Sequence, residues 1–359
     1  MLAYIVLIGV PLVWHILCSL SNIKKKTVKN FSIILFFLIF ILMLGCRGME
    51  VGTDTDNYLF YYELINKASF GDIFKVTTTL SSSMEHGFVL LMKLFCLIHA
   101  PFNLFLLFCA LVSLAPLMVL FYRKSDNPLL VILLFACVSP FTLFFSGIRQ
   151  TMSMGIGVVV LYFAYKRKLF PFCLALIVAF FIHKSSIVLL ILYPLFRIKI
   201  SAKHLPQILL LCLVIVFLGG YILQIITPFL GDYSKYRIMP TGAYRMILLL
   251  LIFSFFCLIV ADENKATPFF YGIRNILCLC LVLQCFSRNS FVATRVMYYF
   301  GIFVPLSIDK TISLAKKDYM SISNYASALM TAFFLIYFFV DTFFGNDGLN
   351  IFPYTPFWD

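Results

Sequence analysis

Long apolar runs alternate with short polar segments along the whole chain. Most runs approach the roughly 20 residues that an α-helix needs to cross a bilayer. The pattern predicts twelve spans, several of them short, at residues 2–20, 31–46, 102–122, 128–145, 151–165, 169–182, 185–197, 206–227, 243–261, 268–286, 291–308 and 322–343. We therefore predict an all-α, polytopic membrane protein with a single transmembrane domain over residues 1–359. The first run lacks a basic flank and an Ala-x-Ala-like cleavage site, so we expect it to be a retained span rather than a signal peptide.

One further apolar run, "HGFVLLMKLFCLIHA" at residues 86–100, is too short to be an ordinary span and carries Lys93 in its middle. These properties favour a re-entrant or interfacial helix. We expect Lys93 to extend its ammonium group toward water, as lysines near a membrane surface do.

The positions of the basic clusters provide an independent test of this topology. With twelve spans, the clusters at 24–29, 123–124, 166–168, 197–203 and 316–317 all fall on one face, which must be cytoplasmic. Counting residues 86–100 as a full span would separate the first cluster from the others. We therefore predict that both termini lie outside the cytoplasm, and that residues 47–101 form the largest periplasmic loop.

Composition supports this class and excludes others. Hydrophobic residues make up 62% of the chain and charged residues 12%, with a mean hydropathy of +1.01, which no water-soluble core could accommodate. The net charge of +13 is then a topology signal, so we expect no nucleic-acid partner. The eleven cysteines lack metal-ligand spacing and are interpreted as small core residues.

Arginine and lysine distribute differently across the predicted faces. Thirteen of the 18 lysines are cytoplasmic, whereas six of the ten arginines fall on the outer side: Arg47, Arg149, Arg237, Arg245, Arg288 and Arg295. The planar guanidinium group suits paired hydrogen bonds to phosphate oxygens, so the asymmetry indicates a phosphorylated ligand at the outer surface. The alternative is that some of these arginines reach lipid headgroups or pair with loop carboxylates.

Polar residues also gather where predicted spans meet the outer face. They occur in five segments: "RGMEVGTDTDNYLFYY" (47–62), "SSSMEHGF" (81–88), "FFSGIRQTMSMGIG" (144–157), "FFIHKSS" (180–186) and "FSRNSFVATRVMYYFGI" (286–302). An ionisable residue within a span is a functional-site hypothesis by default, which ranks Arg295 first by position alone. Gly147, Gly155 and Gly157 would allow close approach of a helix or a ligand.

These segments, in this order, resemble the EpsG/Wzy group of polysaccharide polymerases. The resemblance rests on Arg47 before "GTDTDNY", on Glu85 before Gly-Phe, on "GIRQTMSMGI", "FFIHKSSIVLL" and "ATRVMYYF", and on the terminal "FPYTPFWD". It implies a fold like that of GT-C-like membrane glycosyltransferases. It also implies joining of undecaprenyl-diphosphate-linked oligosaccharide units, as donor and acceptor, into O-antigen or capsule outside the bacterial inner membrane. Membrane lipids and a chain-length regulator are the other expected partners.

That chemistry suggests a role for each candidate residue. A departing diphosphate needs positive charge, for which we predict Arg47, Arg149, Lys184, Arg288 and Arg295. A base must accept the proton of the attacking hydroxyl; the candidates are Asp54, Glu85 and His183, of which Asp54 and Glu85 are favoured. Predicted substrate-binding residues are Asp56, Asn57, Tyr58, Gln150 and Tyr298. Because the diphosphate is an activated leaving group, we expect no metal and no cofactor.

Several alternatives stay open on the sequence. Thr53, Asp54 and Thr55 could simply cap a helix that begins near Asn57. A flippase for the same lipid-linked unit would also suit twelve spans, although we find no internal repeat between the two halves of the chain. An O-antigen ligase would share the donor chemistry. A membrane acyltransferase using His183 and Ser185 is less well supported, because the chain lacks a His-Asp motif.

Overall fold

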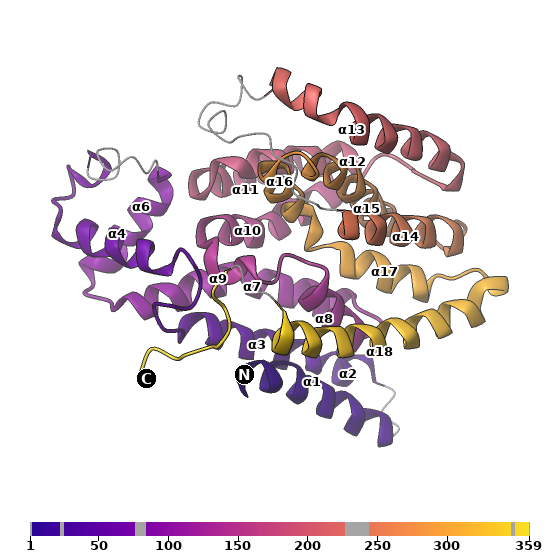
Figure 1. Ribbon diagram of the computed structural model, residues 1–359, viewed down its shortest axis with the longest axis horizontal. Coiled ribbons are helices and arrows are strands. Elements are labelled where there is room, and N and C mark those ends of the chain that lie inside the picture. The colour runs from indigo at the N-terminus through magenta and orange to yellow at the C-terminus, as the bar shows by residue number, and fades with distance from the viewer. Residues whose placement is uncertain (1, 22–24, 76–83, 227–243, 346–348, 359) are drawn as a thin grey trace. The chain divides into compact units, whose positions relative to one another are not determined.

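The computed structural model describes residues 2–21, 25–75, 84–226, 244–345 and 349–358, and all the elements of these segments are helices (Figure 1). They belong to two compact units. Unit 1 comprises residues 1–190 and 333–359, and unit 2 comprises residues 191–332. The all-α class is confirmed. Two units can still belong to one transmembrane domain, so the single-domain interpretation stays a prediction.

Six helices in the described segments are long and apolar enough to cross a bilayer, or seven if one bent pair is a single span. Three of the six are single helices: α1 (Leu2–Leu20), α7 (Phe102–Lys124) and α15 (Pro268–Ser287). A fourth combines η2 (Ala202–His204) with α13 (Leu205–Ile226). The others are α2 (Lys26–Lys29) with α3 (Phe31–Gly45), and α18 (Met320–Phe344) with η4 (Lys317–Tyr319). The bent pair is α16 (Phe291–Gly301) and α17 (Val304–Ser313), at 44°. The chain is thus a polytopic membrane protein, but twelve spans are not shown.

The remaining predicted spans form shorter helices or fail this test. Residues 128–145 divide into α8 (Pro128–Cys137) and α9 (Leu143–Ser146), because Pro140 lacks the backbone N–H that a continuous helix needs. Residues 185–197 divide into η1 (Lys184–Ile191) and α12 (Leu192–Leu195). The others are α10 (Ile148–Tyr165), α11 (Leu169–Ile182) and α14 (Tyr244–Val260). The run at 86–100 forms α6 (His86–Leu97), whose 12 residues are too few for a span.

In unit 1, charged residues lie at the two opposite ends of the pair formed by α3 and α7. Asn30, before α3, donates hydrogen bonds to carbonyl groups at the end of α7, whereas Asn103, in the first turn of α7, donates to Gly45 at the end of α3. The two helices are therefore antiparallel. Lys26 pairs with Asp126 at the first of these ends. Arg47 follows α3 at the opposite end.

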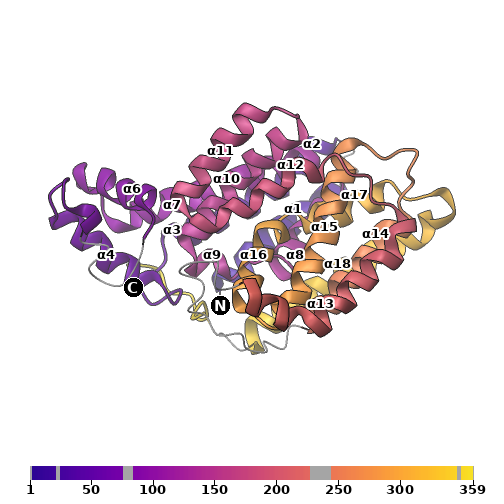
Figure 2. The same ribbon diagram turned by 90° about the horizontal axis from the view of Figure 1, so that it is seen from above.

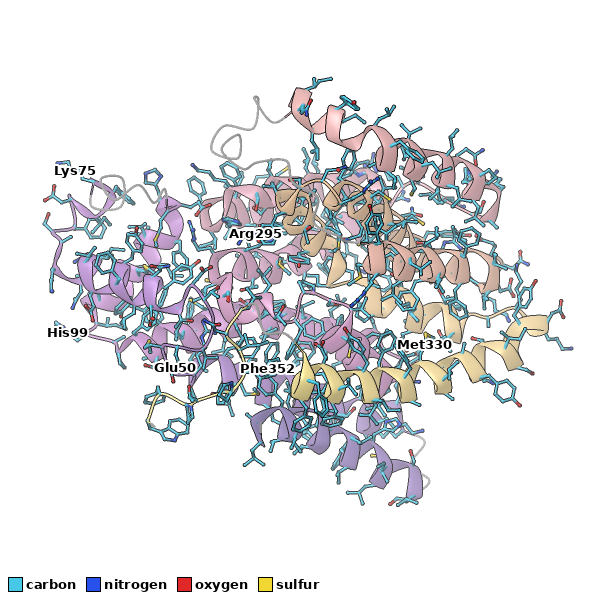
Figure 3. The ribbon with its side chains drawn as sticks, viewed as in Figure 1. Glu50, Lys75, His99, Arg295, Met330 and Phe352 are labelled. Carbon is cyan, nitrogen blue, oxygen red and sulfur yellow. The ribbon has the colours of Figure 1, made fainter. Side chains whose placement is uncertain are left out.

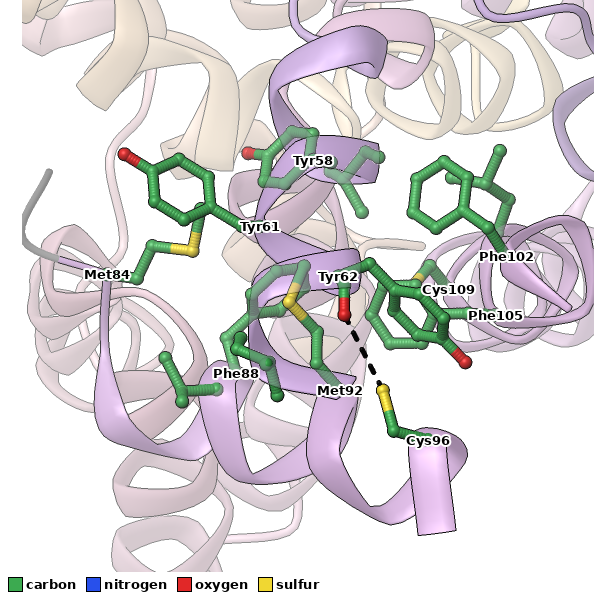
Figure 4. Packing of buried hydrophobic residues seen from close by; sticks show 14 of the residues in the cluster. Tyr58, Tyr61, Tyr62, Met84, Phe88, Met92, Cys96, Phe102, Phe105 and Cys109 are labelled. Carbon is green, nitrogen blue, oxygen red and sulfur yellow. Dashed lines mark hydrogen bonds between the residues drawn. The ribbon is translucent and has the colours of Figure 1, made fainter. Parts of the chain in front are cut away.

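An aromatic cluster joins α4 (Thr55–Lys67), α6 and the start of α7 (Figure 4). Tyr58 and Phe88 meet at 5.7 Å between ring centroids, and Tyr62 lies 5.5 Å from Phe105. The cluster buries one face of α6, with Phe88, Val89 and Met92 inaccessible to solvent. This packing holds the first residues of α4 and α6 next to each other.

Lys93 does not extend toward water. Its side chain is buried, and Nζ donates to the carbonyls of Ile65, Asn66 and Ala68 at 3.1, 3.5 and 2.7 Å. These carbonyls lie at the C-terminus of α4, where the helix dipole favours a cation. The expectation of a lysine reaching for the membrane surface was wrong because three carbonyl acceptors lie closer.

Two glycines permit close helix contacts in unit 1. A Cβ at Gly155 of α10 would lie 2.2 Å from the carbonyl oxygen of Val112 in α7, and one at Gly87 of α6 would lie 2.5 Å from that of Phe181 in α11. Figures 1 and 2 both show α10 beside α11. The expected role of Gly155 is confirmed, and Gly87 brings the start of α6 to the end of α11.

The C-terminal segment packs on the loop that follows α3. Gly48 and Gly52 donate backbone hydrogen bonds to the carbonyls of Thr355 and Asn350, at 2.8 and 2.9 Å. Phe357 donates in return to Cys46. Tyr4 of α1 donates to the Ile351 carbonyl at 2.6 Å, so α1 also contacts the C-terminal segment. Figure 3 labels Glu50 on the loop and Phe352 on the C-terminal segment.

Unit 2 is centred on α15, which packs against α13, α14, α16 and α17. Arg274 is fully buried in α15 and donates to Glu263 at 2.6 Å and to the carbonyl of Ile200. Ser307 of α17 donates to the carbonyl of Ile273 at 2.7 Å. These bonds give unit 2 a polar framework of its own.

Candidate functional site

Glu85 is the centre of a polar cluster in unit 1. It immediately precedes α6, and only 6% of its surface is exposed. Arg149 Nη1 donates to its Oε2 at 2.6 Å, and His183 Nδ1 lies 2.8 Å from its Oε1. The backbone N–H of Lys184 donates to the same Oε1 at 3.1 Å. One carboxylate thus joins the start of α6, the start of α10 and the end of α11.

The electrostatics of Glu85 follow from these partners. Burial by itself raises the pKa of a carboxyl group, but here the His183 hydrogen bond, the charge of Arg149 and the Lys184 N–H outweigh it and lower the pKa to about 2. Glu85 is therefore ionised at neutral pH. It is a weak base in this arrangement, because its two oxygens already accept three hydrogen bonds.

His183 presents its two ring nitrogens differently. Nδ1 faces Glu85, while Nε2 has no hydrogen-bond partner among the residues that the structure describes. The residue ends α11 in an extended conformation, and its side chain keeps 14% exposure. A carboxylate bonded to Nδ1 fixes the ring and leaves Nε2 to exchange a proton, the relation found between acid and histidine in hydrolase triads.

Arg149 lies in the first turn of α10. Its Nε donates to the Tyr58 hydroxyl of α4 at 3.4 Å, and its side chain is 24% exposed. Gly147 precedes the helix, and the Thr151 N–H donates to the Gly147 carbonyl at 2.9 Å. The guanidinium group is held by two elements and keeps access to the surface, as an anion-binding group requires.

Asp54 precedes α4, which begins at Thr55 rather than near Asn57. The Asp54 side chain makes no capping hydrogen bond; the Thr55 hydroxyl instead donates to the Val51 carbonyl at 2.7 Å. Side-chain capping by Asp54 was therefore wrong. Gly52 sets the turn, because its φ is +91° and a Cβ added to it would lie 2.2 Å from the Phe145 carbonyl oxygen, so the position admits only glycine.

Arg47 is enclosed within unit 1, with 2% exposure. Burial lowers the pKa of its guanidinium group to about 10, so the group stays protonated at neutral pH. A lipid diphosphate at the surface does not reach a side chain this deeply enclosed. We therefore leave Arg47 out of the anion-binding group proposed below.

Comparison with known protein families gives a match that covers the whole Glu85 cluster. Residues 30–355 match the EpsG family, a span that includes every residue of the Glu85 cluster. The chain belongs to the EpsG family. This family of membrane proteins is implicated in exopolysaccharide synthesis. No curated protein and no solved structure matches the chain.

The other predicted site residues of this EpsG-family protein occupy varied positions. In unit 1, Asp56, Asn57 and Lys184 are exposed, whereas Gln150 is buried. In unit 2, Arg288 donates to the Val216 carbonyl at 2.8 Å and lines a pocket of about 330 Å³. Arg295 and Tyr298 lie half-buried on α16, with the Arg295 guanidinium 5.0 Å from the centroid of the Phe291 ring (Figure 3). Arg237 falls outside the described residues.

Two features of the EpsG-family site were not anticipated. Glu85 and His183 were considered as separate candidate bases, although they are hydrogen-bonded partners. The hydroxyl of Thr53 lies 3.2 Å from that of Ser146, which links the GTD loop (residues 47–54) to the end of α9, just before α10. The sequence gives no local signal for either pair, because their members are 98 and 93 positions apart. Among the described residues, no group of three metal-ligating side chains could hold an ion.

Proposed function

We propose that this EpsG-family protein polymerises undecaprenyl-diphosphate-linked oligosaccharide units into O-antigen or a related surface polysaccharide. The observation that carries the proposal is the Glu85 cluster, which combines an oriented imidazole with a partly exposed guanidinium group. The growing glycan on its lipid carrier is the donor, and a second lipid-linked unit is the acceptor. The active site faces the periplasm, on the opposite side of the membrane from the basic clusters that are predicted to be cytoplasmic.

The reaction is one displacement at the anomeric carbon of the donor. The acceptor hydroxyl oxygen forms the new bond to this carbon while the bond from carbon to diphosphate oxygen breaks. The leaving undecaprenyl diphosphate keeps the electron pair, and the hydroxyl proton passes to His183 Nε2. This direct transfer inverts the anomeric configuration.

Each member of the cluster has a distinct part in this step. Glu85 positions His183 through Nδ1. Because its lowered pKa keeps it ionised, its negative charge also stabilises the imidazolium that forms. Arg149 and Lys184 neutralise the charge that develops on the diphosphate. Asp54, Asp56 and Asn57 bind sugar hydroxyls from the start of α4. Tyr58, also on α4, contacts Arg149. Helix α4 therefore links the residues that bind the sugar to the arginine that binds the diphosphate.

A flippase for the same lipid-linked unit is the second candidate function, because the protein is polytopic and its family is implicated in exopolysaccharide synthesis. The paired Glu85 and His183 favour the enzyme, since they lie at helix ends, whereas the ion-coupling sites of transporters lie near the bilayer midplane. A ligase would use the same donor chemistry with a different acceptor.

Reconstitution in vesicles with purified lipid-linked units tests the proposal. We expect a ladder of lengthening products with the unaltered protein. His183→Gln should lower its rate by at least 100-fold, because removing a general base costs roughly two to four orders of magnitude. His86→Gln, which changes the exposed histidine that follows Glu85, is the matched control and should keep the ladder.

Other outcomes would contradict the proposal. Movement of substrate between leaflets without new glycosidic bonds would indicate a flippase. Transfer of a finished glycan to a separate acceptor, without extension of lipid-linked units, would indicate a ligase. A full ladder from His183→Gln at normal membrane levels would remove His183 from the mechanism.

A further inference from the structure

The guanidinium group of Arg47 is a buried cation without a protein counter-ion among the residues that the structure describes. Its Nε and Nη2 are enclosed and have no hydrogen-bond partner in those parts of the chain. The nearby titratable side chains are Cys109 and three tyrosines, and none of the ion pairs of the described residues includes Arg47. Burial of an unpaired charge is costly enough that proteins rarely leave one uncompensated.

The surrounding tyrosines do not compensate this charge. Tyr4 and Tyr354 donate their hydroxyl protons to the carbonyls of Ile351 and Met43, at 2.6 and 3.0 Å. The Tyr58 hydroxyl accepts from Arg149. Each of the three hydroxyls is therefore already hydrogen-bonded to a group other than Arg47. The dipole at the C-terminal end of α3 supplies only a partial negative charge to the residue that follows it.

A small cavity adjoins Arg47 inside unit 1. It leaves about 10 Å³ of room for the centre of a water-sized sphere, and its lining includes Arg47, Cys109, Ser113 and Thr151. Ile148, also in the lining, belongs to the first turn of α10, whose 18 residues direct their positive dipole end to this region. The Ser113 and Thr151 hydroxyls in this lining donate to the carbonyls of Cys109 and Ile148, at 2.7 and 3.1 Å. The positive groups that the cavity combines are therefore the guanidinium group and the helix N-terminus.

We propose that this cavity binds a single monatomic anion, chloride under physiological conditions, as the counter-ion of Arg47. The cavity admits a water-sized sphere whose centre has only about 10 Å³ in which to move, so it accommodates a single small ligand. A monatomic ion matches this space better than a phosphate or a carboxylate, each of which carries several heavy atoms. The charge of Arg47 selects an anion over neutral water. The bound ion would stabilise the junction of α3, α7 and α10 independently of the polymerase reaction.

Thermal unfolding of the full chain in detergent tests the proposal, with chloride replaced by gluconate at constant ionic strength. A site that binds chloride only in the folded state raises Tm as chloride increases, and the cavity excludes gluconate. We expect a rise on the order of 2 °C for each tenfold increase in chloride above the dissociation constant. Bromide should act like chloride and give an anomalous scattering signal at the cavity in crystals.

Two variants of the cavity and one control variant assign the effect to the cavity. Arg47→Met should abolish the difference between chloride and gluconate. Lys93→Met removes another buried cation, one with carbonyl partners of its own, and should leave the difference intact. Ala110→Val, which adds atoms to the cavity lining, should raise the half-saturating chloride concentration about tenfold and serves if Arg47→Met does not fold.

Several results would overturn the proposal. Identical unfolding curves in chloride and gluconate would mean that the cavity holds only water. A chloride effect that survives unchanged in folded Arg47→Met, or a bromide signal elsewhere, would place the ion at another site. None of these readouts depends on polymerase activity, so failure of one proposal leaves the other intact.

Discussion

Replacing Glu85 by Gln should destabilise unit 1 and do so in a pH-dependent way. The pKa of Glu85 falls from 4.5 to about 2 on folding, through the partners that outweigh its burial. At about 1.4 kcal/mol per pKa unit, the ionised carboxylate gains about 3 kcal/mol over its protonated form. The amide resembles the protonated form in charge and shape. We therefore expect Glu85→Gln to lose about 3 kcal/mol of unfolding free energy near pH 7.

The sign of the pH dependence follows from the lowered pKa. The contribution of Glu85 is complete above its unfolded pKa of 4.5 and is lost as the pH falls through the folded value of about 2. The difference between the two proteins should shrink to about 1.4 kcal/mol near pH 3. Equilibrium unfolding in mixed micelles at both pH values measures it.

A double-mutant cycle with Arg149→Gln identifies the partner. The two side chains meet at 2.6 Å, so the substitutions should be non-additive by at least about 1 kcal/mol. A destabilisation by Glu85→Gln that is equal at both pH values, or additive substitutions, would refute the electrostatic account of this cluster.

Three further changes test other features. Gly52→Ala should cost at least about 2 kcal/mol in unfolding measurements, since the new Cβ meets the Phe145 carbonyl at positive φ, whereas Gly71→Ala, with nothing within 4 Å, should be nearly neutral. Lys93→Met should cost about 1–3 kcal/mol by the same measurement, because three carbonyls lose their donor, while Lys67→Met on the exposed side of α4 should stay within about 0.5 kcal/mol. Deleting residues 349–359 should leave the loop at 47–54 open to limited proteolysis and abolish the product ladder; protection equal to that of the intact chain would contradict the packing role of this segment.

The membrane class and the helical fold could be read from hydropathy, but the number of spans could not. Apolar runs identify residues that avoid water, whether they face lipid or other helices. Residues 128–145 are apolar throughout, and yet α8 ends at Cys137, with most of its residues fully or almost fully inaccessible to solvent. A buried helix of this kind needs no particular length, whereas a lipid-facing span must match the bilayer.

The site was predictable as a set of residue types but not as a set of pairs. Arg149, Glu85 and His183 stood out because each is a polar group at the boundary of an apolar run. Their pairing depends on the approach of α6 to α11 at Gly87, which is a tertiary contact between segments about 100 residues apart. Arg47 and Lys93 were expected at the membrane surface, but both are buried. A charged residue near an apolar run gives no local indication of whether the fold will bury it.

The contact between the C-terminal segment and the GTD loop has a consequence for biosynthesis. Glu50 and its partner Thr355 are 305 positions apart, so the loop is synthesised long before the segment that packs on it. The region beside the Glu85 cluster therefore cannot close on a nascent chain that has not yet reached residues 350–357. Assembly of this side of unit 1 is in this way delayed until the helices between the two segments have been made.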